Sequence, residues 1–301
     1  MAIPPRQAFI VLALCGLLSA YGAIWLTLLS EGVSGIPYWP FTLIGVFGAS
    51  IANSTGAGGG VVFVPAFSIA EAQTAITLST NQIVAMSLLI QCFGMSVGSL
   101  TWLNRMAERP SELDLPQPVF WRIIGLSLTL CLPSIWMTQA IVRVDTDLLL
   151  ILFKSFSLIL GGLLLASTFR PTRAAPRSTL TPTDQGVILG LGAIGGVATA
   201  LLSVGVGEFI ALYLFLRGFS LNVSVAAAVI VTAISVIAAA PLAVLNGAPY
   251  WPIVAMAVPG VMLGGFLGRR IAQGLGPTRL KRLAALWIIG SSLYLIYVRL
   301  T

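Results

Sequence analysis

The chain contains no histidine and has only nine acidic and sixteen basic residues among its 301. Without histidine it lacks the commonest general base, metal ligand and near-neutral proton switch. We therefore expect neither a metalloenzyme nor a histidine-dependent hydrolase. Soluble domains carry roughly 25% charged residues, whereas this chain carries 8%, which excludes an ordinary soluble domain.

Cysteine is scarce as well. Cys15, Cys92 and Cys131 all lie in apolar segments, and none has a partner at the spacing of metal ligands. This pattern is typical of small apolar core residues. The sequence therefore predicts no metal site, no cofactor and no catalytic residue.

The chain is rich in apolar residues. Hydrophobic residues make up 57% of the chain, and the mean hydropathy is +1.00. Several stretches reach the ~20 apolar residues needed to cross a bilayer as a helix, and none alternates like the strands of a membrane barrel. These features predict an all-α integral membrane protein. Residues 8–30 exceed the ~7–15 apolar residues of a signal peptide, which indicates a retained first helix.

The net charge of +7 comes largely from basic residues in two short loops, 170–177 and 269–282. Such clusters mark the cytoplasmic side of a membrane protein. No basic face carries interleaved aromatic residues, so we expect a lipid bilayer around the chain and no nucleic-acid partner.

A polar, glycine-rich segment interrupts the second apolar stretch. Residues Asn53 to Gly60 read NSTGAGGG and stand where a membrane helix would otherwise continue. Non-helical backbone at membrane depth persists only when it is buried in protein or lines a wet cavity. A second interruption, Leu201 to Glu208, follows in the other half of the chain. Paired interruptions in corresponding halves point to a secondary transporter with its site near the midplane.

The order of segments repeats once. An N-terminal helix (1–36) precedes a first repeat (37–169), a basic cytoplasmic linker (170–185) and a second repeat (186–301). Each repeat holds one broken segment and three helices, which we expect near residues 74–103, 119–141 and 148–169, then near 221–245, 251–271 and 280–298. The proposed duplication depends mainly on this shared order.

The basic loops also predict how each broken segment runs. For loops 170–177 and 269–282 to share the cytoplasmic side, the broken segment between them must enter and return as a hairpin. Each repeat then has three crossings, and this odd number inverts the second repeat relative to the first. The sequence predicts seven spanning helices, two hairpins that meet from opposite faces, and an external C-terminus.

The two hairpin tips are suited to hold an anion. Glycine permits positive φ and close approach of a substrate to the backbone. The second half of each hairpin begins near Gly60 and Gly207, where a helix N-terminus presents unpaired N–H groups and about half a positive charge. The predicted substrate-binding residues are Asn53, Ser54, Thr55, Gly56, Gly58, Gly59, Gly60, Asn81, Gln82, Ser203, Gly205 and Gly207.

Other interpretations of these residue types compete with a site. No Lys-Ser or Lys-Thr follows the glycine-rich segment, which argues against a nucleotide site. Close helix packing is the interpretation that we favour for Gly94, Gly98, Gly192, Gly196, Gly260, Gly264 and Gly268. Either interhelical hydrogen bonds or substrate contact explains the polar residues on the helices after the hairpins, which are Asn81, Gln82, Ser87, Gln91, Thr232 and Ser235.

Two charged residues are candidates for coupling transport to an ion. Glu208 follows the second tip, at a depth where a carboxylate is costly and usually functional. It is a candidate proton carrier, a candidate cation ligand, or a carboxylate held by a buried lysine. Lys154 lies inside an apolar segment, where it either snorkels to the interface or serves as a counter-charge to the substrate or to Glu208.

At the two interruptions the chain resembles the sulfite exporter TauE/SafE family of membrane permeases. The stretch GASIANSTGAGGGVVFVPAF looks like the glycine-rich segment of that family with its following proline, here Pro65. The stretch from Leu245 to Ile296 is similar to the end of the family's second repeat. The chain departs from the family pattern at the second tip, where Val206 and Glu208 interrupt the glycine run and Leu212 stands in place of a proline.

The resemblance implies a carrier in a bacterial-type inner membrane that exports sulfur-containing anions such as sulfite or organosulfonates. We therefore expect a secondary transporter of a small anion, not an enzyme, with protons as the candidate coupling ion. The alternative is a proton- or cation-coupled carrier of a neutral or cationic solute with Glu208 as ligand. The sequence leaves open the direction of transport, the coupling ion, the choice between carrier and channel, and the oligomeric state.

Overall fold

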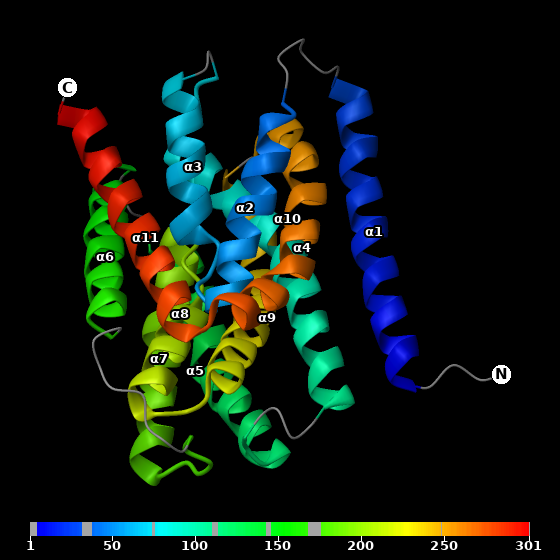
Figure 1. Cartoon of the computed structure of the whole chain (residues 1–301). Coiled ribbons are helices and arrows are strands. Elements are labelled where there is room, and N and C mark those ends of the chain that lie inside the picture. Colours follow the sequence, from blue (N-terminus) through cyan, green and yellow to red (C-terminus); the bar gives the residue numbers. More distant parts are fainter. Residues whose placement is uncertain are drawn as a thin grey trace.

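Helices make up the regular secondary structure of the described residues in the computed structural model (Figure 1). The structure describes residues 5–31, 38–73, 76–109, 114–142, 146–167, 176–247 and 249–300. In chain order the helices are α1 Pro5–Glu31, α2 Pro40–Thr55, α3 Gly60–Gln73, α4 Thr80–Glu108, α5 Gln117–Ile141, α6 Thr146–Ser167, α7 Pro182–Leu202, α8 Val206–Arg217, α9 Leu221–Gly247, α10 Trp251–Leu275 and α11 Pro277–Leu300. The predicted all-α class is confirmed.

The predicted order of segments is also confirmed. α2 with α3 forms the first hairpin, α7 with α8 forms the second, and three helices follow each. Both interruptions are shorter than predicted. Asn53 to Thr55 still belong to α2, because the chain leaves the helix only at Gly56, whose left-handed φ of 75° ends it. Likewise α7 continues to Leu202 and α8 begins at Val206. The domain boundaries stay a prediction, and residues 170–175 of the linker lie outside the described residues.

Six helices of the described part of the chain are long and apolar enough to cross a membrane, namely α1, α4, α5, α7, α9 and α10. The predicted set of seven spanning helices differs from these. It includes α6 and α11, whose apolar segments Lys154–Ala166 and Ala285–Tyr294 are shorter, and it leaves out α7, which ends at a tip. At 1.5 Å per residue, α7 is about 31 Å long, so length alone does not separate a hairpin arm from a spanning helix.

Glycine stripes let each hairpin pack closely against a helix of the other half. α2 packs against α10, where a Cβ at Gly260, Gly264 or Gly268 would collide with atoms of α2. α7 packs against α5, where a Cβ at Gly192 or Gly196 would collide with the α5 backbone. Small residues at this spacing allow the close approach on which helix association in membranes depends, so the predicted packing role of these glycines is confirmed.

The helix pairings match an exchange of two related halves. The contact of α2 with α10 becomes the contact of α7 with α5 when the halves are exchanged, and the pairs α4 with α9 and α6 with α11 map onto themselves. In Figure 1 the first hairpin runs in from the end of the bundle where α1 finishes, and the second from the end where α1 begins. The inverted repeat stays a prediction, which these pairings support.

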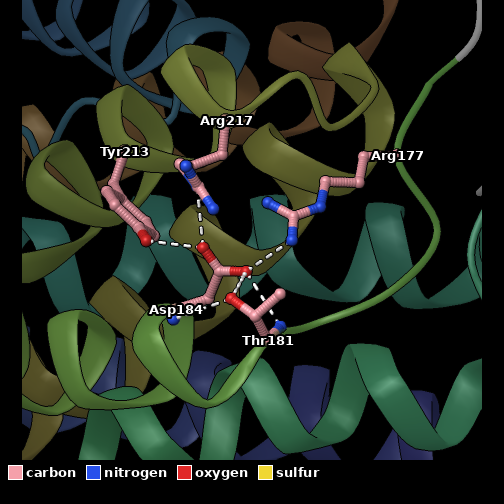
Figure 2. Close-up of polar contacts among 5 residues, drawn as sticks. All are labelled: Arg177, Thr181, Asp184, Tyr213 and Arg217. Atoms are coloured by element: carbon pink, nitrogen blue, oxygen red, sulfur yellow. Dashed lines mark hydrogen bonds and ion pairs between the residues drawn. The ribbon is translucent and has the colours of Figure 1, made fainter.

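A buried ion cluster closes the base of the second hairpin, where α7 begins and α8 ends (Figure 2). Asp184 is fully buried, and its Oδ2 accepts from the backbone N–H and the hydroxyl of Thr181 at 2.9 and 2.7 Å. Arg177 donates to Oδ2 at 2.9 Å and Arg217 to Oδ1 at 2.7 Å, and the hydroxyl of Tyr213 donates to Oδ1 at 2.7 Å. One carboxylate therefore holds both arms of the hairpin together at their base.

Asp184→Ala is expected to lower the free energy of unfolding by about 2–4 kcal/mol. Breaking a buried ion pair leaves the partner charges unpaired, and the partial exposure of Arg217 (41%) and Arg177 (18%) reduces the loss. Thermal melting of the purified protein in detergent measures the change. The control is Arg122→Ala, which removes an exposed hydrogen bond to Gln185. Similar melting points for both variants would contradict a stabilising role for the cluster.

Candidate functional site

The tips of the two hairpins touch each other in the interior of the protein. A Cβ added at Gly58 would lie 2.6 Å from the Cα of Gly205, and one added at Gly60 would collide with the backbone of Ser203. Residues 52–65 and 202–208 are all buried. The two glycine-rich segments therefore meet, and their contact leaves no room for a side chain at Gly58 or Gly60.

The first tip runs from Gly56 to Gly59. Gly56 adopts a φ of 75°, and a Cβ there would lie 2.8 Å from the Cβ of Ala228 on α9. Conformation and space both require glycine at this position. The hydroxyl of Thr55 accepts a hydrogen bond from the N–H of Ala57 at 3.1 Å, which fixes the chain as it turns toward α3.

The second tip runs from Ser203 to Gly205. Ser203 takes a left-handed φ of 58°, a conformation uncommon for residues that carry a side chain. Beyond the tip, the N–H of Gly207 in the first turn of α8 donates to the hydroxyl of Thr232 on α9 at 3.1 Å. The second tip is therefore supported by a side chain of the helix that follows its hairpin.

Gln91 of α4 bridges the two tips. Its Oε1 accepts from the N–H of Gly59 at 2.7 Å, and its Nε2 donates to the hydroxyl of Ser203 at 2.8 Å and to its carbonyl at 3.1 Å. The hydroxyl of Ser203 in turn donates to the hydroxyl of Ser87 at 2.9 Å. Gln91 is only 1% exposed, so these neutral polar groups act in the protein interior, where hydrogen bonds are electrostatically stronger than in water.

Glu208 faces the first tip from the first turn of α8. Its carboxyl oxygens are buried and have no hydrogen-bond partner among the described residues. The N–H of Gly58 approaches the carboxyl group without meeting the geometry of a hydrogen bond. A cavity of about 20 Å³ adjoins Glu208 and is lined by Thr55, Ala57 and apolar side chains of α6, α8 and α11. A cavity of this size holds about one water molecule.

Lys154 does not hold the carboxyl group of Glu208. Neither oxygen of Glu208 accepts a hydrogen bond from it, so the predicted role of Glu208 as a lysine-held carboxylate is wrong for this conformation. α6 contacts α8 through the rings of Phe156 and Phe209, whose centroids are 5.3 Å apart.

The three predicted polar residues of α2 are bonded largely within the helix. The hydroxyls of Ser54 and Thr55 each donate to the carbonyl of Ile51 at 2.9 Å. Asn53 donates to the carbonyls of Ala49 and Gly94, and a Cβ at Gly268 of α10 would lie 2.5 Å from its Cβ. Asn53 therefore contributes to packing between α2, α4 and α10, and only Thr55 of the three also bonds the tip.

The two predicted amides of α4 lie at its beginning, away from the tips. Gln82 forms a capping box with Ser79: its side chain accepts from the N–H of Ser79 at 2.9 Å, and the hydroxyl of Ser79 accepts from the N–H of Gln82 at 3.2 Å. Asn81 is exposed and lines a separate pocket. Ser87 and Gln91, deeper in α4, are the residues that the structure brings to the tips instead.

Two helices, α3 and α8, begin at the contact between the tips. Each N-terminus carries about half a positive charge, so their convergence favours a negatively charged ligand. In this conformation the N–H groups of Gly59 and Gly207 are bonded to Gln91 and Thr232, and Gly58 contacts Gly205. The point where the two helices begin is therefore occupied by contacts between protein groups in this structure.

Comparison with known proteins agrees with this architecture. A model of the sulfite exporter TauE/SafE family matches residues 41–295, which include both hairpins and the helices that support them. Neither the search of curated proteins nor the search of solved structures found a match. The members of the matching family are membrane transporters rather than enzymes. The chain belongs to the sulfite exporter TauE/SafE family.

Proposed function

We propose that the chain is a secondary transporter that exports a small sulfur-containing anion, such as sulfite or an organosulfonate, and binds it between the two tips. The observation that carries this proposal is the buried contact of two glycine tips at which α3 and α8 begin. Two helix N-termini attract an anion without a fixed cation. Binding of this kind is weak enough to allow release, as transport requires.

The substrate gains access when the two hairpins move apart. The second hairpin is tied at its base by Asp184, and the tips are joined by Gln91, which is a neutral hydrogen-bonded contact and therefore easier to break than an ion pair. An anion that takes the place of the Gln91 side chain would accept a hydrogen bond from the same N–H group of Gly59. We place the basic loops in the cytoplasm of a bacterial-type inner membrane, in line with the charge rule.

In our proposal Glu208 couples the separation of the hairpins to the transfer of a proton. An unpaired carboxylate is costly inside a protein, so contact between the tips favours the protonated carboxyl group. When the tips separate and water enters the cavity beside Glu208, the proton can leave. The same unpaired carboxyl group supports the second candidate function, a carrier of a cationic or neutral solute in which Glu208 is the ligand.

Ligand-dependent melting of the purified protein tests the proposed substrate. Sulfite or a short organosulfonate is expected to raise the melting temperature, because a ligand present at 100 times its Kd stabilises the folded state by about 2.7 kcal/mol. Sulfate, simple carboxylates and monovalent cations are the comparison set. No shift with any anion, together with a cation-induced shift that disappears in Glu208→Gln, would overturn the anion assignment and establish the second candidate.

A further inference from the structure

We propose that the base of the second hairpin binds the headgroup of an anionic phospholipid through two arginines. Arg177 lies in the linker before α7 and Arg217 ends α8, and both are paired with the carboxylate of Asp184 (Figure 2). The site lies at the end of the bundle that the charge pattern predicts to be cytoplasmic. It is separate from the tips, and the inference does not depend on which anion the protein transports.

The carboxylate of Asp184 neutralises only one of the two arginines. Its Oδ1 accepts hydrogen bonds from Tyr213 and Arg217. Its Oδ2 accepts two hydrogen bonds from Thr181 and is paired with Arg177. An ionised carboxylate offers about four lone-pair sites, so this one has no capacity left for the other N–H groups of either arginine. Neither arginine is ion-paired with a second described residue, and the cluster therefore keeps an excess positive charge.

Each arginine side chain uses only part of its hydrogen-bonding capacity. Arg217 contacts Asp184 through Nε, at 2.7 Å, and Arg177 contacts it through one Nη, at 2.9 Å. A guanidinium group has five N–H donors, and the others form no hydrogen bond with a described residue. The side chain of Arg217 is 41% exposed and that of Arg177 is 18% exposed, so both are open to the surface. Guanidinium N–H groups bind phosphate oxygens in pairs through strong, charge-assisted hydrogen bonds.

The protein holds the two arginines together without a ligand. The backbone N–H of Arg177 donates to the carbonyl of Gly218 at 2.9 Å, and its guanidinium carbon lies 5.7 Å from the centre of the Phe219 ring. These contacts fix the linker along the end of α8. Because each guanidinium group then meets one oxygen of the same carboxylate, the two groups are prearranged for a ligand, and less conformational freedom is lost when it binds.

Exposed apolar side chains beside the cluster favour a lipid over a soluble anion. Leu216 directly precedes Arg217, and Val187 lies three residues after Asp184 on α7, and both are exposed. α7 is long and apolar enough to span a membrane, and the cluster lies at its beginning, which is the level of the lipid headgroups. Anionic lipids of the cytoplasmic leaflet are attracted to basic side chains at this level. A phospholipid can therefore place its phosphate on the arginines and its acyl chains against Leu216 and Val187.

Titration of the purified protein in detergent with phosphatidylglycerol and phosphatidylcholine tests this proposal. We expect the first phosphatidylglycerol to bind about thirtyfold more tightly than phosphatidylcholine, because each basic residue near the surface contributes about fivefold to the affinity for an anionic lipid. Arg217→Gln is expected to weaken the binding of phosphatidylglycerol about fivefold. The matched control is Arg270→Gln at the exposed end of α10, which should leave this affinity unchanged. Native mass spectrometry of the first bound lipid measures the affinities, and melting without lipid checks the fold.

Equal binding of the two lipids by the wild-type protein, or an unchanged affinity in Arg217→Gln, would overturn the lipid site. Glycerol 3-phosphate that binds as tightly as phosphatidylglycerol would assign the arginines to a soluble phosphate instead. Should Arg217→Gln fail to fold, Arg217→Lys decides. It keeps a positive charge for Asp184 but lacks the planar fork of donors, so the site requires weaker binding, and wild-type affinity would show that charge alone attracts the lipid. None of these outcomes bears on the proposed anion transport.

Discussion

A single methyl group at Gly58 is expected to reduce anion transport by about five- to a hundredfold. The added Cβ would lie 2.6 Å from the Cα of Gly205 and would also collide with its backbone nitrogen. Backbone atoms cannot rotate away as a side chain can, so the two tips must separate to accommodate the methyl group. Overpacking of this kind costs roughly 1–3 kcal/mol, and each 1.4 kcal/mol is a factor of ten in population. In the transport cycle that we propose, the loss falls on the state in which the tips are in contact.

Flux of a radiolabelled sulfonate into proteoliposomes measures the effect at equal amounts of folded protein. The control is Gly190→Ala on α7, where an added Cβ meets nothing within 4 Å and transport should stay close to that of the wild type. Gly59 is a poorer choice for the test, because a Cβ there meets the side chains of Phe63 and Gln91 rather than the backbone of the other tip. Wild-type flux in Gly58→Ala would show that transport does not depend on the contact between the tips.

The glycine runs made the fold largely predictable from the sequence. An apolar chain with two polar, glycine-rich interruptions has few ways to satisfy its backbone in a membrane, and the positions of the basic loops reduce these further. The exact residues at which the interruptions begin and end were less predictable from the sequence. Asn53 to Thr55 remain helical because α2 ends only at Gly56, with its left-handed φ of 75°. Their side chains bond to carbonyls of the same helix, which the residue types alone do not reveal.

The residues that support the tips were predictable by type but not by position. Asn81, Gln82 and Gln91 are equally polar, yet only Gln91 reaches both tips. Their position along the helix separates them, because Gln91 is the amide nearest the middle of α4, whereas the other two lie only two and three residues after the capping serine Ser79. A polar side chain at a helix end can form hydrogen bonds with water or with a capping residue, so it does not need to lie in a buried site.

The Asp184 cluster shows the limit of sequence reasoning. The spacing from Thr181 to Asp184 is that of a capping box, and it marks the start of α7. The partners Tyr213 and Arg217 lie far along the chain, and only the return of α8 alongside α7 brings them to the carboxylate. Pairing across a hairpin depends on where both arms begin and end, which composition does not determine.

Glu208→Gln is expected to abolish proton-driven accumulation of the anion, with a loss of about a hundredfold or more in gradient-driven flux when the side chain is the obligatory proton carrier. The side chain is 4% exposed, and neither carboxyl oxygen is hydrogen-bonded within the described structure. Glutamine keeps the size and polarity of the protonated carboxyl group but cannot release a proton. The variant should therefore hold the tips as the wild type does and lose only the step that depends on the proton.

An anion-exchange measurement distinguishes a loss of proton coupling in Glu208→Gln from structural damage to the tips. With anion on both sides of the membrane and no pH gradient, Glu208→Gln is expected to exchange substrate within a fewfold of the wild-type rate, because exchange needs the tips to open and close without a net proton movement. The control is Glu108→Gln at the exposed end of α4, which makes the same chemical change outside the site and should leave both activities unaltered. Glu208→Asp, which keeps a titratable group one methylene shorter, should restore part of the gradient-driven flux.

The pattern of losses also distinguishes the two candidate functions. If Glu208 binds a transported cation, Glu208→Gln removes a ligand and abolishes exchange and gradient-driven flux together, since neither proceeds without the bound ion. If Glu208 carries a proton for an anion, exchange persists. Unchanged gradient-driven flux in Glu208→Gln would contradict both roles. The unpaired carboxyl group would then reflect packing against the glycine tip, at an energetic cost that burial of Val206, Ile210 and Leu214 of α8 would have to offset.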